Sequence, residues 1–292
     1  MQILTWISTA MKNKDFCAFI LSNNRANKVY TYETLRKCGY TGPIVIVIDS
    51  LDKKANEYKK LYGDQVYVFD KVKAGQITDS GDNFGTLRGV VYARNMNNEI
   101  AKELGYKYYI QLDDDYTDFR HKRNNYGTYS DKRIKDLDGV WDAMLDYFKD
   151  TPITSLAMAQ GGDFIGGKDS GTIEKPKRKV MNSFIFSVDR PYEFFGRINE
   201  DVNMYVYLGS QGKLFVTVTI VSLQQKQTQK NSGGLTELYL DSGTYVKSFY
   251  SILYMPSSVK IAVMHSKNPR IHHMVRWRNT VPQIVEERFK KY

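Results

Sequence analysis

The segment Tyr108-Tyr109-Ile110-Gln111-Leu112-Asp113-Asp114-Asp115 is an apolar run that stops at three consecutive carboxylates. Such a run predicts a strand buried inside a sheet, and open α/β sheets bind their ligands outside the carboxyl ends of the strands. Adjacent carboxylates repel one another, and a divalent cation relieves this repulsion while it bridges to phosphate oxygens. The segment therefore predicts a metal and phosphate site at residues 113–115, with a solvated acidic turn as the alternative.

A helix is predicted directly upstream, at residues 86–105, with Gly105 as its stop. Apolar residues recur there at three- and four-residue steps, namely Leu87, Val90, Ala93, Met96, Ile100 and Leu104. Ala93-Arg94-Asn95 lies inside this helix, and Gly105-Tyr106 follows it. The ordered string of Ala-Arg-Asn, helix, Gly-x-x-Tyr/Phe, apolar strand and Asp-x-Asp resembles the nucleotide-sugar-dependent glycosyltransferases of GT-A fold.

Strands and helices alternate in the first half of the chain. Strands are predicted at residues 16–22, 44–48 and 66–69, and helices at residues 31–38 and 53–62. This order implies an α/β fold with a doubly wound, mostly parallel sheet, which agrees with the GT-A-like fold that the resemblance implies. We expect one GT-A-like domain over residues 1–292, with a nucleotide-sugar half at about 1–118 and an acceptor half with basic loops at about 119–292.

The ends of the first two predicted strands offer further groups for a nucleotide. The GT-A resemblance implies that Arg25 and Asp49 hold the base and ribose, and a carboxylate accepts hydrogen bonds from a base imide or a ribose hydroxyl. Arg88 and Arg94 are candidates for the diphosphate, because guanidinium forks match phosphate oxygens. A surface ion pair is an equal alternative for each arginine. The predicted donor-binding residues are Arg25, Asp49, Arg88, Arg94, Asp113 and Asp114.

Residues 197–202, Arg-Ile-Asn-Glu-Asp-Val, follow a strand predicted at residues 184–188. Inverting GT-A enzymes carry their catalytic base in an acidic pair at this point, so the resemblance implies Asp201 as the base and Glu200 as the second candidate. The base would deprotonate the acceptor hydroxyl as it attacks the anomeric carbon. The alternative is that Asn199, Glu200 and Asp201 only cap the helix that follows.

Three of the four histidines, His265, His272 and His273, lie close together near the C-terminus. GT-A enzymes commonly complete their metal site with a C-terminal histidine, so the resemblance implies a divalent cation held by Asp113, Asp115 and either His272 or His273. Neighbouring residues on an extended segment point to opposite faces, so only one of the two should reach the metal. An imidazole among carboxylates suits Mn²⁺ and an all-oxygen site suits Mg²⁺. A histidine pair that contacts phosphate is the alternative.

The chain is basic, with 42 Lys and Arg residues against 32 Asp and Glu residues and a net charge of +10. The positive charges cluster at residues 120–135, 175–179 and 260–278. Such clusters fit either solvated faces or a polyanionic acceptor such as nucleic acid. The two cysteines are too few for a disulfide framework, and we expect no secretory signal and no membrane span. These features predict a cytoplasmic protein.

Residues 236–273 make the resemblance more specific, from GT-A enzymes in general to one group of them. The segments that include Tyr239, residues 243–248, Pro256 and residues 270–273 are similar to a group of phage GT-A enzymes associated with thymine- and methylcytosine-oxidising dioxygenases or with hydroxymethylated phage DNA. The resemblance implies a UDP-sugar donor, glucose or arabinose as the sugar, 5-hydroxymethylcytosine in double-stranded DNA as the acceptor, and the host cell cytoplasm as the location.

Three alternatives remain open on the sequence. One is a GT-A enzyme that acts on a surface glycan, lipid or protein, and another is a non-catalytic DNA-binding protein. The third is a nucleotidyltransferase, which would need a Gly-rich loop after the first strand. Ser22-Asn23-Asn24-Arg25 follows that strand and contains no Gly. No helix-turn-helix or zinc-finger pattern supports the DNA-binding alternative.

Overall fold

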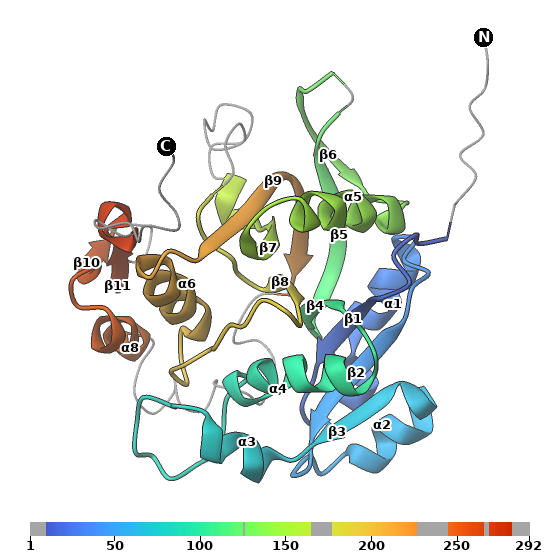
Figure 1. The fold of residues 1–292 in the computed structure, drawn as a ribbon, viewed down its shortest axis with the longest axis horizontal. Helices are drawn as coiled ribbons and strands as arrows, with labels where there is room; N and C mark the ends of the chain where they lie inside the picture. Colours follow the sequence, from blue (N-terminus) through green and yellow to red (C-terminus); the bar gives the residue numbers. More distant parts are fainter. Residues whose placement is uncertain (1–9, 125, 165–176, 227–244, 266–268, 282–292) are drawn as a thin grey trace.

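A nine-stranded mixed sheet forms the centre of the fold in the computed structural model, which describes residues 10–124, 126–164, 177–226, 245–265 and 269–281 (Figure 1). The strand order is β3-β2-β1-β4-β8-β7-β9-β5-β6, and β10 and β11 form a separate antiparallel pair. The strands are β1 Phe16–Leu21, β2 Ile44–Asp49, β3 Val66–Phe69, β4 Tyr108–Asp113, β5 Tyr116–Arg123, β6 Tyr129–Arg133, β7 Ile153–Ala159, β8 Ser183–Ser187, β9 Leu214–Gln225, β10 Val259–Met264 and β11 Arg270–Val275.

Helices cover both faces of the large sheet. They are α1 Tyr30–Lys37, α2 Ala55–Tyr62, α3 Lys71–Ile77, α4 Val91–Glu103, α5 Leu137–Lys149, α6 Glu200–Ser210 and α8 Val246–Tyr254. Side chains of β1 alternate between two cores: Phe16 and Ala18 pack with α1, α2 and α5, whereas Cys17 and Phe19 pack with α4 and α6. This alternation explains why β1 is apolar throughout, because both of its faces are covered. The predicted doubly wound α/β fold is confirmed.

Parallel pairing is concentrated in the first half of the chain. Strands β3, β2, β1 and β4 pair in parallel, as do β7 and β9, whereas β8, β5 and β6 pair antiparallel with their neighbours. The carboxyl ends of β1, β2 and β4 therefore lie at one edge of the sheet. Residues 22–25, Asp49 and the acidic triplet all follow strands at this edge.

The helix predicted at residues 86–105 is shorter than expected and begins only at Val91. Gly89 has a φ of 124°, which a right-handed helix does not allow. Leu87 and Val90 are apolar because they pack against the same core from a loop, so their spacing extended the pattern beyond the helix. The predicted stop is confirmed, since Gly105 follows the last helical turn with a φ of 79°.

Candidate functional site

The acidic triplet lies at the carboxyl end of β4, and its three side chains have different surroundings. Asp114 is 4% exposed and accepts hydrogen bonds from Ser22 Oγ at 2.6 Å and Arg25 Nη1 at 3.1 Å. Asp113 is partly exposed and accepts one from Arg94 Nη2 at 2.9 Å. Burial and the charges of Asp113 and Asp114 raise the pKa of Asp115 to about 7. No ion pair reaches Asp115 among the described residues.

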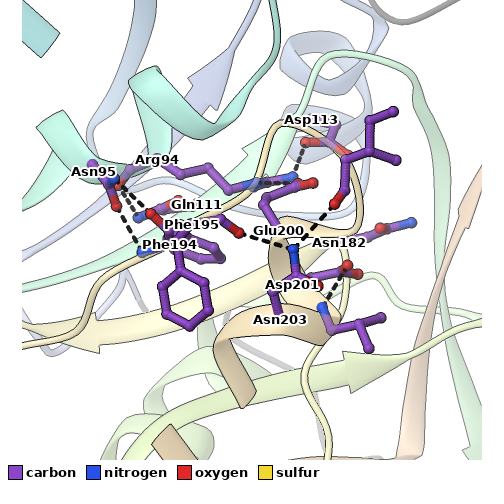
Figure 2. Close-up of polar contacts among 12 residues, drawn as sticks. Arg94, Asn95, Gln111, Asp113, Asn182, Phe194, Phe195, Glu200, Asp201 and Asn203 are labelled. Carbon is purple, nitrogen blue, oxygen red and sulfur yellow. Dashed lines mark hydrogen bonds and ion pairs between the residues drawn. The ribbon is translucent and has the colours of Figure 1, made fainter. Parts of the chain in front are cut away.

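Arg94 connects the triplet to Glu200, which lies 106 residues after Arg94 in the sequence. Its Nη2 donates to Asp113, and its Nε donates to Glu200 Oε1 at 3.0 Å (Figure 2). Its guanidinium lies over the ring of Phe184, 4.7 Å from the centroid, and the side chain is only 3% exposed. The backbone carbonyl of Arg94 accepts a hydrogen bond from Gln111 Nε2. Arg94 is therefore a buried link between two carboxylates rather than an exposed group.

Glu200 and Asp201 begin α6, next to the triplet. Asn199 precedes them with a φ of 57°, and its side chain makes no capping hydrogen bond to the helix. Burial and the charge of Glu200 raise the pKa of Asp201 to about 7, although its Oδ1 accepts a hydrogen bond from the backbone nitrogen of Val202 at 2.7 Å. A carboxyl group with such a pKa can take up a proton near neutral pH.

The two other predicted donor-binding groups, Asp49 and Arg88, differ in exposure. Asp49 is 4% exposed and accepts hydrogen bonds from Asn23 Nδ2 at 2.8 Å and Lys71 Nζ at 2.7 Å. Arg88 has an exposed side chain on the loop at residues 78–90, and its carbonyl accepts a hydrogen bond from Arg197. The carboxyl ends of β2 and β4 thus carry Asp49 and the triplet, and Arg94 joins Asp113 of the triplet to Glu200 at the start of α6.

A family model described as TET-Associated Glycosyltransferase matches residues 16–234. The chain belongs to this family. The match covers the Ala-Arg-Asn string, the acidic triplet and the Glu200–Asp201 pair. Together with the mixed α/β sheet, it confirms the glycosyltransferase of GT-A type that the sequence resemblance implied. No curated protein sequence is significantly similar to this glycosyltransferase.

Solved structures with similar folds have low sequence identity to the glycosyltransferase. A mycobacterial protein aligns with a TM-score of 0.47 and 9% identity, over 92% of this chain and 86% of that one. Glucosyl-3-phosphoglycerate synthase from Mycobacterium tuberculosis, in complex with Mn²⁺, uridine diphosphate and phosphoglyceric acid, aligns with a TM-score of 0.42 and 9% identity, over 89% and 86% of the two chains. GalNAc-T7, with UDP, GalNAc and Mn²⁺, aligns with a TM-score of 0.40 and 14% identity, over 72% of this chain and 43% of that one.

The C-terminal histidines of the glycosyltransferase lie in a cationic environment. His273 Nδ1 is 3.1 Å from Asn199 Nδ2, and burial together with the positive charges of Lys247 and Arg270 lowers the pKa of His272. Within the described ranges, no group of three or more His, Cys, Asp or Glu side chains is arranged to hold a metal. The structure therefore does not assemble His272 or His273 with Asp113 and Asp115, and nearby positive charges disfavour a cation at the histidines.

Part of the basic surface is neutralised within the protein. On β5 and β6, Arg120 and Arg133 form ion pairs with Asp118, and Lys122 pairs with Asp131 at 2.8 Å. The basic cluster at residues 120–135 thus contributes less free positive charge than its composition suggests. Residues 165–171 of the Gly-rich stretch 160–171 lie outside the described residues. Within the described ranges, no helix is both long and apolar enough to span a bilayer.

Sequence reasoning missed two ion pairs, one of which involves the predicted site residue Asp49. Lys71, which binds Asp49, immediately follows the strand-end residue Asp70, and this position is the signal that could have identified it. Arg197 forms an ion pair with Asp82 at 2.8 Å. These two residues are far apart in the sequence and belong to no shared motif, so no local pattern could have paired them.

Proposed function

We propose that this glycosyltransferase moves a sugar from a UDP-sugar to the hydroxymethyl group of a modified pyrimidine, 5-hydroxymethylcytosine, in DNA, with inversion at the anomeric carbon. The observation that carries the proposal is the double ion pair of Arg94, which holds Asp113 at 2.9 Å and Glu200 at 3.0 Å. This contact brings the end of β4, which we propose for the diphosphate, beside the start of α6, which we propose for the catalytic base. Transfer of a sugar needs both groups at one site.

Asp113 and Asp115 are the residues proposed to hold a divalent cation. Asp113 and Asp114 each have an arginine partner, whereas the pKa of Asp115 is raised by burial and by the two neighbouring charges. A bound cation would lower that pKa and offset the cost of burying the third carboxylate. Asp113 and Asp115 would hold it through oxygen ligands, which suit Mg²⁺ and Mn²⁺. When bound, it would supply positive charge for the leaving diphosphate.

Asp201 is the base in this proposal. The acceptor hydroxyl oxygen forms its bond to the anomeric carbon while the bond from that carbon to the diphosphate breaks, and the hydroxyl proton passes to Asp201. Its pKa of about 7 matches this task at neutral pH. Glu200 cannot serve equally well, because it is committed to Arg94. Arg94 acts as a positioning residue, since its buried guanidinium fixes Asp113 and Glu200 without facing the solvent.

The family and the sequence resemblance support the choice of both substrates. The family description associates these glycosyltransferases with TET proteins, and the related phage enzymes imply a hydroxymethylated base as the acceptor. Asp49 at the end of β2 is the group proposed for the uracil or the ribose. The sugar, glucose or arabinose, depends on the shape of the pocket around the anomeric carbon.

Mass spectrometry of nucleosides tests the proposal. Duplex DNA that contains 5-hydroxymethylcytosine is incubated with the protein, Mn²⁺ and a panel of UDP-sugars. We expect a gain of one hexose or one pentose, which Asp115→Asn and Asp201→Asn abolish. The exposed Asp64→Asn, at the opposite edge of the sheet, is the matched control and should retain activity. Metal-dependent hydrolysis of a UDP-sugar without transfer to DNA would reject the DNA acceptor. The absence of both hydrolysis and transfer would favour a non-catalytic protein.

A further inference from the structure

A cluster of basic residues, Lys247, Arg270 and His272, lies near Asp201, the proposed base. Asn199, which precedes Glu200 and Asp201, connects its parts. Its Nδ2 donates to the backbone carbonyl of Lys247 at 2.9 Å and lies 3.1 Å from His273 Nδ1. The first turn of α8 and the strand β11 are thereby joined to the beginning of α6. Lys247 and the β11 residues consequently approach the segment that carries Asp201.

Lys247, Arg270 and His272 lie close enough to act on one another electrostatically. The pKa of Lys247 is lowered by burial and by the positive charge of Arg270, and only Asp201 acts in the opposite direction. Burial, Lys247 and Arg270 likewise lower the pKa of His272. None of these three residues has an ion-pair partner among the described residues, unlike Arg120 and Lys122 on β5 and β6.

The β10–β11 hairpin extends the cluster along one face. Antiparallel register pairs Ala262 with His272, Lys260 with Met274, and Met264 with Arg270. Directly paired residues share a face and alternate residues return to it, so Lys260, Arg270 and His272 lie on the same side of the hairpin. Lys260 and Arg270 are exposed. The Nδ1 of His272 is buried and has no hydrogen-bond partner within the described part of the chain.

We propose that Lys247, Arg270 and His272, with Lys260 at the margin, form a binding site for a phosphodiester of the acceptor DNA, next to the nucleotide that receives the sugar. This inference rests on the proposed function. Lys247 and Arg270 repel each other and have no ion-pair partner among the described residues, so a phosphate would bind there favourably because its charge relieves their repulsion. A guanidinium and an imidazole also supply the directional donors that a phosphate accepts.

The position of the cluster favours the acceptor over the donor as the source of this phosphate. The donor diphosphate belongs with the triplet on β4, where Arg25 and Arg94 already engage Asp114 and Asp113. Lys247 of the cluster instead lies within electrostatic reach of Asp201, the proposed base. A DNA backbone that passes over β10 and β11 would therefore present its target base to Asp201. Enzymes that modify a base in duplex DNA extrude that base from the stack, so contacts to the flanking phosphate help to hold the extruded nucleotide.

Binding measurements on single variants test this site. The dissociation constant for a hydroxymethylated duplex is measured at several salt concentrations for Arg270→Ala and Lys247→Ala, and UDP affinity is measured in parallel by calorimetry. We expect each variant to weaken DNA binding about 3- to 10-fold and to reduce the slope of log K against log salt by about 1, with UDP affinity unchanged. Lys60→Ala on the exposed last turn of α2 removes the same charge elsewhere and should bind like the wild type.

Other outcomes would overturn the assignment. A loss of UDP affinity with unchanged DNA affinity would indicate that the site binds the diphosphate of the donor and not a phosphate of DNA. If the wild type glycosylates DNA and both variants bind DNA as the wild type does, the phosphate site is wrong and the proposed function stands. If the wild type neither binds nor modifies hydroxymethylated DNA, the proposed function and the phosphate site fail together.

Discussion

Replacing Asp201 by Asn should stabilise the glycosyltransferase at neutral pH while it removes activity. Burial and the charge of Glu200 raise the pKa of Asp201 from its ordinary value of 3.8 to about 7. Between about pH 4 and pH 7, the folded protein keeps a proton that the unfolded chain has released. The stabilisation from this proton is fully present below about pH 4, is lost as the pH rises, and is gone above about pH 7.

The size of the effect follows from the difference between the two pKa values. About three pH units at 1.36 kcal/mol each give an upper limit of about 4 kcal/mol. Asp201 keeps some exposure, so solvent screens part of this penalty. We expect Asp201→Asn to raise the free energy of unfolding by about 1–2 kcal/mol at pH 8, with about two-thirds of that gain gone at pH 5.

Urea denaturation at pH 5 and pH 8, with a chelator present, measures this difference. Glu200→Gln is the contrasting variant: it leaves Arg94 with one carboxylate partner and should lower the free energy of unfolding by about 2–4 kcal/mol. Activity of Asp201→Asn should fall by about 10²- to 10⁴-fold. A variant Asp201→Asn that is less stable than the wild type at pH 8, or a gain that is the same at both pH values, would refute the reasoning.

Three further substitutions test the roles of Arg94, Asp115 and Arg197. Arg94→Lys should lower kcat about tenfold or more with an unchanged donor KM, because one ammonium cannot hold two carboxylates; a raised donor KM alone would instead make Arg94 a diphosphate ligand. Asp115→Asn should weaken Mn²⁺ binding at least tenfold in a titration followed by electron paramagnetic resonance, and unchanged binding would place the metal elsewhere. Arg197→Ala should lower the free energy of unfolding by about 3–5 kcal/mol in urea, because Asp82 is left buried without its partner; a loss below about 1 kcal/mol would contradict this.

Local patterns in the sequence predicted the fold of the first half of the chain well. The apolar runs that became β1, β2 and β4 are continuous because both sheet faces are covered, and each ends at the polar residues that line the carboxyl edge. The order of motifs along the chain therefore sufficed to bring Asp49 and Asp113 to one edge. The second half was harder to predict, since β5 and β6 are short of apolar residues and carry paired charges such as Arg120 with Asp131.

The roles of charged residues could not be predicted from residue type alone. Arg94 was expected to bind diphosphate, yet it is buried against Phe184 and neutralised by two carboxylates. His272 was expected near the triplet, yet it lies with Lys247. In both cases the decisive partner is distant in the sequence, and only the folded chain determines whether a cation meets a carboxylate, another cation or the solvent.

The ion pairs of Arg94 and Arg25 also explain how the acidic triplet and the Glu200–Asp201 pair can lie close together. Arg94 neutralises Asp113 and Glu200, and Arg25 neutralises Asp114. Asp115 and Asp201 remain, and these are the two carboxyl groups whose pKa is raised to about 7. In the proposed reaction, a divalent cation would relieve the first and the proton of the acceptor would relieve the second. Two carboxyl groups with similar pKa values thus have different roles, because one adjoins the diphosphate site and the other adjoins the acceptor.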